Sequence, residues 1–117
     1  MQLQTNTRTA LLALHRHLLQ VQRVEVERFG GRMTPGELLK AATEDLRFSW
    51  LRELSELIVA LDHAHAEGEP VEPHLEKART LIAPPDEDTP FGARYLWALQ
   101  ASPDVVLAHR DAVASLS

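Results

Sequence analysis

The segment DLRFSWLRELSELIVALD, residues Asp45 to Asp62, decides the fold of this chain. When residues are placed about 100° apart, one arc collects large apolar side chains, as in a helix that faces a protein core. These are Leu46, Trp50, Leu54, Leu57, Ile58, Leu61 and, just beyond the segment, Ala64. A second, thinner stripe holds Phe48, Ser55 and Val59. A helix with apolar side chains on two sides has neighbours on two sides, so the sequence predicts a central helix here.

Two helices are predicted before this segment. The first covers Thr5 to Phe29, where leucine and valine recur at helical spacing, and Gly30-Gly31 supplies a left-handed end. Thr34-Pro35-Gly36-Glu37 then opens a short helix with three signals: a threonine cap, a proline at the first helical position and the glutamate of a capping box. We expect this short helix to end near Glu44, so that Asp45 caps the central helix.

Two helical segments are predicted after it. Leu75 to Ile82 form an amphipathic helix that is stopped by the prolines of the loop PPDEDTP, Pro84–Pro90. This acidic loop lacks the spacing and the glycine of an EF-hand, so we interpret it as a solvated linker. The last segment starts at Thr89-Pro90, and its apolar positions stay in phase across Pro103. It is either one kinked helix or two helices with Ser102 as a cap, and we favour two nearly collinear segments.

The chain of 117 residues is long enough for one core, so we expect a single domain over residues 1–117. No strand-like alternation is present, and the sequence predicts an all-α fold. Long, short, long, medium and long helices with short loops favour an antiparallel four-helix-type bundle. The first, third, fourth and last helices would form its walls, and the short extra helix between the first and second long helices would close one end.

Composition and charge exclude several classes of protein. The chain has no cysteine, which excludes disulfides and thiolate chemistry. A net charge of −5 argues against nucleic-acid binding. Residues 1–33 hold five arginines against two glutamates, so a basic first helix is expected to lie against acidic neighbours, or else to bind an anionic partner. No run approaches the about 20 uncharged apolar residues of a membrane span. His15-Arg16-His17 also interrupts any signal peptide, so we expect a cytoplasmic protein.

Three segments of the sequence together resemble a known family. They are LLALHRHLLQVQRVEVERFG (residues 11–30), TPGELLKAATEDLRFSWLRELSELIVALD (residues 34–62) and YLWALQASPDVVLAHRDAVASL (residues 95–116). The chain in this respect resembles small, uncharacterised bacterial all-helical proteins. The resemblance implies a stand-alone bacterial helical protein, and it implies no activity, cofactor or catalytic residue.

Polar residues on predicted apolar faces are the candidates for a binding site. His15 and Gln22 lie on the apolar face of the first helix, and His109 lies on that of the last. At about 1.5 Å per residue, both histidines and Arg79 fall at similar heights in an antiparallel bundle. We interpret His15 and His109 as core histidines that burial keeps neutral. The alternatives are a buried polar network and a ligand site formed by His15, Gln22, Arg79 and His109.

No catalytic residue, metal site or cofactor is predicted. Asp62 and His65 form one acid-x-x-His pair, whereas a di-iron bundle site uses two such pairs and two further glutamates. The serines have neither a glycine-rich elbow nor a phosphate-binding loop around them.

We therefore interpret the chain as a non-enzymatic interaction or regulatory bundle that forms a homodimer, with another protein as a possible partner. The second stripe of the central helix (Phe48, Val59) and the outward-pointing Trp97 are the predicted oligomer surface. The alternative for Phe48 is packing on the short helix that precedes the central one, which would need no partner. The alternative is a small-molecule or metal-binding bundle with a pocket around His15 and His109. An enzyme whose reaction the sequence does not indicate is the third possibility.

Overall fold

A computed structural model describes the backbone of residues 2–117 and the side chains of residues 6–117. All regular elements of this part of the chain are helical, which confirms the all-α class. They are α1 (Gln2–Gly30), α2 (Pro35–Glu44), the 3-10 helix η1 (Leu46–Leu51), α3 (Arg52–Ala66), α4 (Glu72–Ile82), α5 (Pro90–Ala101) and α6 (Pro103–Leu116). Over these residues, no helix has the length and apolarity that crossing a bilayer requires.

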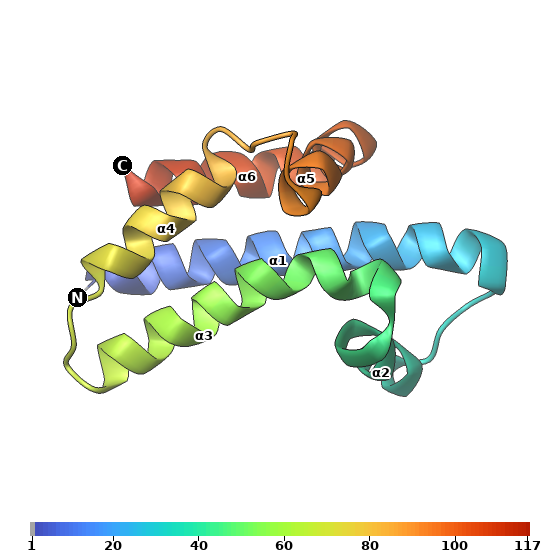
Figure 1. The fold of residues 1–117 in the computed structure, drawn as a ribbon, viewed down its shortest axis with the longest axis horizontal. Helices are drawn as coiled ribbons and strands as arrows, with labels where there is room; N and C mark the ends of the chain where they lie inside the picture. Colours follow the sequence, from blue (N-terminus) through green and yellow to red (C-terminus); the bar gives the residue numbers. More distant parts are fainter. Residues whose placement is uncertain (1) are drawn as a thin grey trace.

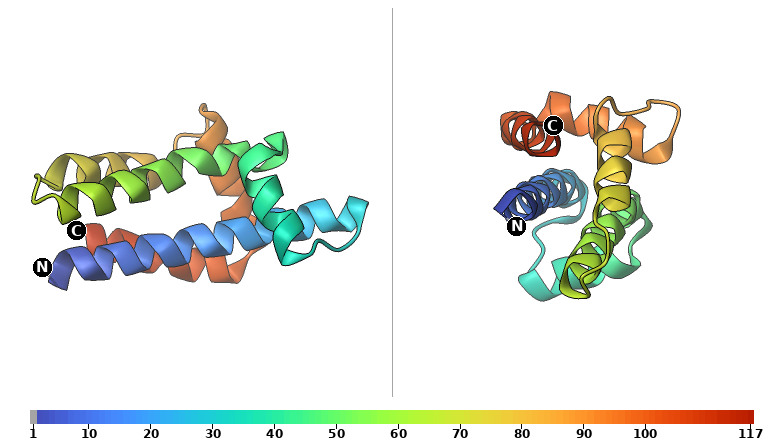
Figure 2. Two further views of the ribbon diagram at one scale, coloured as in Figure 1. Left: turned by 90° about the horizontal axis from the view of Figure 1, so that it is seen from below. Right: turned by 90° about the vertical axis from the view of Figure 1, so that its left-hand side faces the viewer.

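The long helix α1 is the axis around which the other helices are arranged (Figure 1). α6 lies alongside it, α3 packs on another side, and α4 contacts both α3 and α6. α5 contacts α1, α4, α6 and η1. At its C-terminal end α1 extends beyond α3, α5 and α6, with α2 beneath it (Figures 1 and 2). This projecting end leaves part of α1 without a helix above it.

The predicted ends of the first two helices are confirmed. α1 ends where Gly31 takes a positive φ of 81°, a conformation that glycine adopts without steric cost. At the start of α2, the Glu37 amide donates to the Thr34 hydroxyl (3.1 Å), and the Thr34 amide donates to the Glu37 carboxylate (2.9 Å). Pro35 occupies the first turn. This capping box satisfies amides that the helix itself leaves unpaired.

The central segment begins differently from the prediction. Residues Leu46–Leu51 form a 3-10 helix, capped by the Asp45 carboxylate, which accepts the Arg47 amide (2.9 Å), and the α-helix starts only at Arg52. A 3-10 helix turns by about 120° per residue, so the faces expected for an α-helix rotate. The placement of Leu46 in the core is therefore wrong, because 86% of its surface is exposed. The expectation that Phe48 forms part of an oligomer surface is also wrong, because Phe48 is buried in the core. η1 contacts α2, as the alternative placement of Phe48 requires.

From Trp50 onward the predicted core face is confirmed. Trp50, Leu54, Leu57 and Leu61 are all buried. They join one cluster with residues of every other element, which includes Leu11, Leu14 and Leu18 of α1, Ile82 of α4, Tyr95 of α5 and Val105 of α6. Burying an apolar side chain of this size contributes about 1.5–3 kcal/mol, so this cluster is the main stabilising feature of the fold.

Of the two alternatives for the last segment, the structure has two separate helices, α5 and α6, with Ser102 as the cap of α6. Ser102 is extended (φ −142°, ψ 119°), its hydroxyl accepts the Val105 amide (3.3 Å), and Pro103 opens α6. The expected collinear arrangement of the two segments is wrong, because α5 runs across the direction of α6 (Figure 2). An extended residue at the junction redirects the chain, and the apolar phase that continues past Pro103 does not reveal that change.

Candidate functional site

The four residues predicted as a ligand site have separate surroundings. Gln22 is buried, with 3% of its surface exposed. Its side-chain oxygen accepts the Trp50 indole N–H (2.8 Å) and an Arg94 N–H (2.8 Å). The amide therefore links α1 to η1 and to α5, rather than to either histidine.

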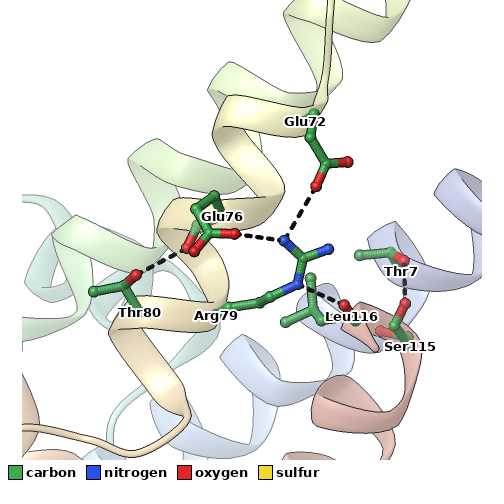
Figure 3. Close-up of polar contacts among 7 residues, drawn as sticks. All are labelled: Thr7, Glu72, Glu76, Arg79, Thr80, Ser115 and Leu116. Atoms are coloured by element: carbon green, nitrogen blue, oxygen red, sulfur yellow. Dashed lines mark hydrogen bonds and ion pairs between the residues drawn. The ribbon is translucent and has the colours of Figure 1, made fainter.

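Arg79 holds the end of α6. Its Nε donates to the Leu116 carbonyl (2.6 Å), and Nη1 donates to Glu72 (3.2 Å) and Glu76 (2.8 Å) (Figure 3). The Thr7 hydroxyl of α1 donates to the neighbouring Ser115 carbonyl (3.1 Å) (Figure 3). The last carbonyls of a helix lack partners within it and carry partial negative charge, which suits a guanidinium. Arg79 thus joins α4 to α6.

The two histidines have different surroundings. His109 Nδ1 is 2.6 Å from the Tyr95 hydroxyl. Burial lowers the pKa of His109 and raises the pKa of Tyr95, so the hydroxyl keeps its proton and donates to a neutral ring. His15 lines a recess of about 320 Å³ together with Thr43, Arg52 and other residues of α1, α2, η1 and α3. Burial lowers the pKa of His15 as well.

Among residues 6–117, no three histidine, aspartate or glutamate side chains gather closely enough to hold a metal ion. Ligand binding at His15, Gln22, Arg79 or His109 stays a prediction.

A groove at the projecting end of α1 is the more distinctive site. It has a volume of about 520 Å³ and lies between the last turns of α1, η1 and the first turns of α5. We call it the end groove; its principal lining residues are Val26, Phe29, Leu46, Trp50, Ala93 and Arg94. Both Val26 and Trp50 belong to the hydrophobic core, so the groove reaches down to buried apolar surface.

Two large apolar side chains flank the end groove in water. Phe29, in the last turn of α1, is 83% exposed, and Leu46, the first residue of η1, is 86% exposed. An isolated exposed leucine is common on protein surfaces. Phe29 and Leu46 together, beside an apolar groove, form a patch of the kind that marks interaction sites.

Arg94 organises the polar side of the end groove. Its Nη2 donates to Gln22 (2.8 Å) and to Glu25 (2.6 Å), and its guanidinium carbon lies 3.8 Å from the centre of a Trp97 ring. Trp97, which the sequence places on an outward surface, is thus half-buried and carries Arg94 on one face. Across the groove, Arg47 pairs with Asp45 (2.6 Å).

Arg94 is not among the residues that the sequence predicts for a site. The available signal was its spacing from Trp97, since residues three apart on a helix face the same way and suit cation–π contact.

A series of aromatic rings supports the floor of the end groove from behind. Ring centres are 5.8 Å apart for Trp50 and Phe91, 5.4 Å for Phe91 and Tyr95, and 5.5 Å for Tyr95 and His109. Offset and edge-to-face ring pairs of this kind add about 0.5–1.5 kcal/mol each beyond simple burial. The groove floor is therefore fixed to η1, α5 and α6 and is formed before any partner arrives.

Comparisons of this chain with protein-family models, with curated proteins and with solved structures find no match. What the end groove does must therefore follow from its own chemistry.

Proposed function

We propose that this protein is a non-enzymatic interaction module that forms a homodimer through the end groove. The observation that carries the proposal is the exposure of Phe29 and Leu46 on either side of a preformed apolar groove. A two-fold dimer uses the same patch on both copies, so a patch must supply both the projecting side chains and the groove that receives them. The end groove supplies both.

The charges around the end groove favour a second copy as the partner. The whole chain carries a net charge of −5, so two copies repel each other overall. At this end the charges are paired within each copy, Glu25 with Arg94 and Asp45 with Arg47. Two such neutral patches meet without mutual repulsion, which a strongly acidic face does not allow.

The size of the patch sets the expected affinity. Ten residues line the groove, against about 20–30 residues per side in a standard interface. Because association first has to offset the loss of translational and rotational freedom, a patch this small supports a dissociation constant in about the micromolar range or above. We expect a dimer that forms and separates with concentration.

The interface in this proposal differs from the one expected from sequence. Phe48 is buried and Trp97 is partly covered by Arg94, so neither offers a free apolar surface. Val59 is exposed on α3 and is the one residue of the predicted oligomer surface that a partner could still contact. This makes Val59 a matched control for the end groove.

We also infer that α1, α3, α4 and α6 act as the four walls of a bundle. The inference is supported by a closed ring of contacts: α1 with α3, α3 with α4, α4 with α6, and α6 with α1. In this description η1 and α5 lie at the side of a rigid support and shape the end groove. The interaction surface and the stabilising core are then separate parts of one domain.

Sedimentation velocity over about 5–500 µM, a range that brackets a micromolar dissociation constant, tests the dimer. We expect the wild-type mass to rise from 13.1 kDa towards twice that value. Phe29→Asp and Leu46→Asp should stay monomeric and folded, because both positions are exposed. Val59→Asp should behave as wild type. A wild-type mass of 13.1 kDa throughout would overturn the proposal. Dissociation by Val59→Asp alone would move the interface to α3.

A further inference from the structure

A second groove lies between α3 and α4 and has a different character. Its volume is about 700 Å³, and its apolar lining is Leu57 and Ala60 of α3 and Leu81 of α4. We call it the acidic groove, because carboxylates stand around this lining. They are Glu53 and Glu56 on α3, Glu76 on α4 and Asp86 in the loop before α5.

The carboxylates of the acidic groove are largely uncompensated. Lys77 is the single lysine or arginine among its lining residues. Glu76 pairs with Arg79, but within residues 6–117 Glu53, Glu56 and Asp86 form no ion pair. The end groove has paired charges and a neutral balance, whereas this groove presents unpaired negative charge on α3 and on the adjoining loop. Clefts lined by one sign of charge attract partners of the opposite sign.

The loop that carries Asp86 is held in place. The Asp86 carbonyl accepts the Thr89 amide (3.1 Å) and the Thr89 hydroxyl (2.8 Å). It also lies directly against Gly92, where an added Cβ would overlap the carbonyl. Only glycine allows this approach, so α5 fixes the backbone at Asp86. The backbone at Asp86 is therefore held at this end of the groove, and its carboxylate accepts the Asp88 amide (2.9 Å).

We infer that the acidic groove binds a basic amphipathic helix of another protein. From Glu53 to Ala60 the groove runs along α3 for about two helical turns, or about 10 Å at 1.5 Å per residue. Recognition of a helix in a groove uses apolar side chains spaced by three and four residues over such a length. Lysines or arginines beside those apolar residues would meet Glu53, Glu56 and Asp86. The charge complementarity is what selects a basic partner.

A second copy of this chain does not provide such a helix. Its arginine-rich helix is α1, whose apolar face is already used within its own fold, since Leu11, Leu14 and Leu18 are fully buried. A basic helix that is amphipathic and free must therefore come from a different protein. This inference is independent of dimerisation through the end groove.

A labelled synthetic peptide tests the inference by fluorescence anisotropy. The probe is a helix of about four turns with leucines spaced by three and four and lysines elsewhere. One control peptide has glutamate in place of lysine, and another has the same composition with the leucines scattered. We expect micromolar binding of the probe, weakened as salt rises from about 0.05 to 0.3 M because exposed charges are screened. Both controls should bind at least about tenfold more weakly, a difference of about 1.4 kcal/mol.

Paired variants locate the binding. Glu53→Gln/Glu56→Gln should weaken the probe about fivefold, since exposed charge pairs contribute modestly. Glu67→Gln/Glu69→Gln changes the net charge equally on exposed residues outside the groove and should have no effect. Ala60→Lys should abolish binding, whereas Val59→Lys, on the neighbouring exposed residue, should not. Phe29→Asp should bind normally, which separates this result from the dimer test.

Three results would overturn the inference. The scattered peptide binding as well as the probe would mean unspecific attraction of cations. Equal effects of the two glutamine pairs would place the peptide elsewhere on the surface. Binding of octylammonium in place of the peptide would make the groove a site for small cations.

Discussion

The middle of the central segment and its first turn are made of the same residue types, yet they behave in opposite ways. Leu54, in α3, has no exposed surface, whereas Leu46, eight positions earlier in η1, has 86% of its surface exposed. Leu54 lies in a regular α-helix with α1 and α4 as neighbours. Leu46 starts a 3-10 turn that directs it to solvent beside the end groove. Local backbone geometry, more than hydrophobicity, therefore decides whether a leucine stabilises the fold or is available to a partner.

Trp50 belongs both to the hydrophobic core and to the lining of the end groove. Its replacement should have the largest effect on stability. It is buried, its ring lies over Phe91, and its indole N–H pairs with Gln22. Trp50→Ala should lower the free energy of unfolding by about 3–5 kcal/mol, because it leaves a cavity and removes the hydrogen bond from the indole to Gln22. Urea titration followed by circular dichroism measures this. Trp97→Ala, at a half-buried ring, should cost clearly less. A loss below about 1 kcal/mol for Trp50→Ala would mean that η1 is not part of the core.

The same truncation at two leucines tests the comparison directly. Leu54→Ala should cost about 2–5 kcal/mol, as for other fully buried leucines. Leu46→Ala should change stability by no more than about 0.5 kcal/mol, the range for surface positions. Thermal and urea unfolding of both variants give the two values under identical conditions. Equal losses at the two sites would show that Leu46 packs in solution and that the end groove is closed.

The parts of the fold that sequence predicted are those fixed by local chemistry. The capping box at Thr34, the left-handed end at Gly31 and the cap at Ser102 each depend on a few adjacent residues, and all are present. The core positions from Trp50 to Leu61 follow from helical periodicity and are also correct.

The errors concern geometry that periodicity does not encode. A 3-10 turn at residues 46–51 uses ordinary helix-forming residues, so no sequence signal separates it from an α-helix. Phe29 has the spacing of a core residue, but α1 extends beyond its neighbours there (Figure 1). How far a helix extends beyond the elements that pack on it depends on the tertiary structure, so the spacing of apolar residues does not reveal it. Phe29 and Leu46, two residues whose exposure the sequence does not predict, flank the end groove.

The four residues predicted for a binding site have separate surroundings for a related reason, and ligand binding by them stays a prediction. Heights along a bundle place His15, His109 and Arg79 at similar levels, but contact also requires matching positions around each helix axis. In the structure Arg79 donates to a carbonyl at the end of α6, and His109 contacts the Tyr95 hydroxyl. For Gln22 the prediction of a polar residue on a buried face is correct, while its partners Trp50 and Arg94 depend on the packing of η1 and α5.

The smallest expected effect concerns the half-buried His15 and its recess. Burial lowers the pKa of His15 and of His109 below the ordinary value of 6.5. In the unfolded chain these rings bind protons as pH falls below about 6.5, while in the folded protein they resist protonation. Stability is therefore full above that pH and falls as pH drops through the lower folded-state pKa. Wild type should be more stable near pH 8 than near pH 5.5 in urea titrations.

Two substitutions assign this pH dependence to His15. His15→Leu and His15→Gln both remove the titrating ring, so each should flatten the change in unfolding free energy between pH 5.5 and 8. The remaining slope belongs to other groups such as His109. The carboxylate of Asp45 does not interfere, since Arg47 holds its pKa at about 2, far below this window. If wild type were instead more stable near pH 5.5 and His15→Leu removed that gain, His15 would be charged and paired in the folded state, and its recess would be a polar site rather than an extension of the core.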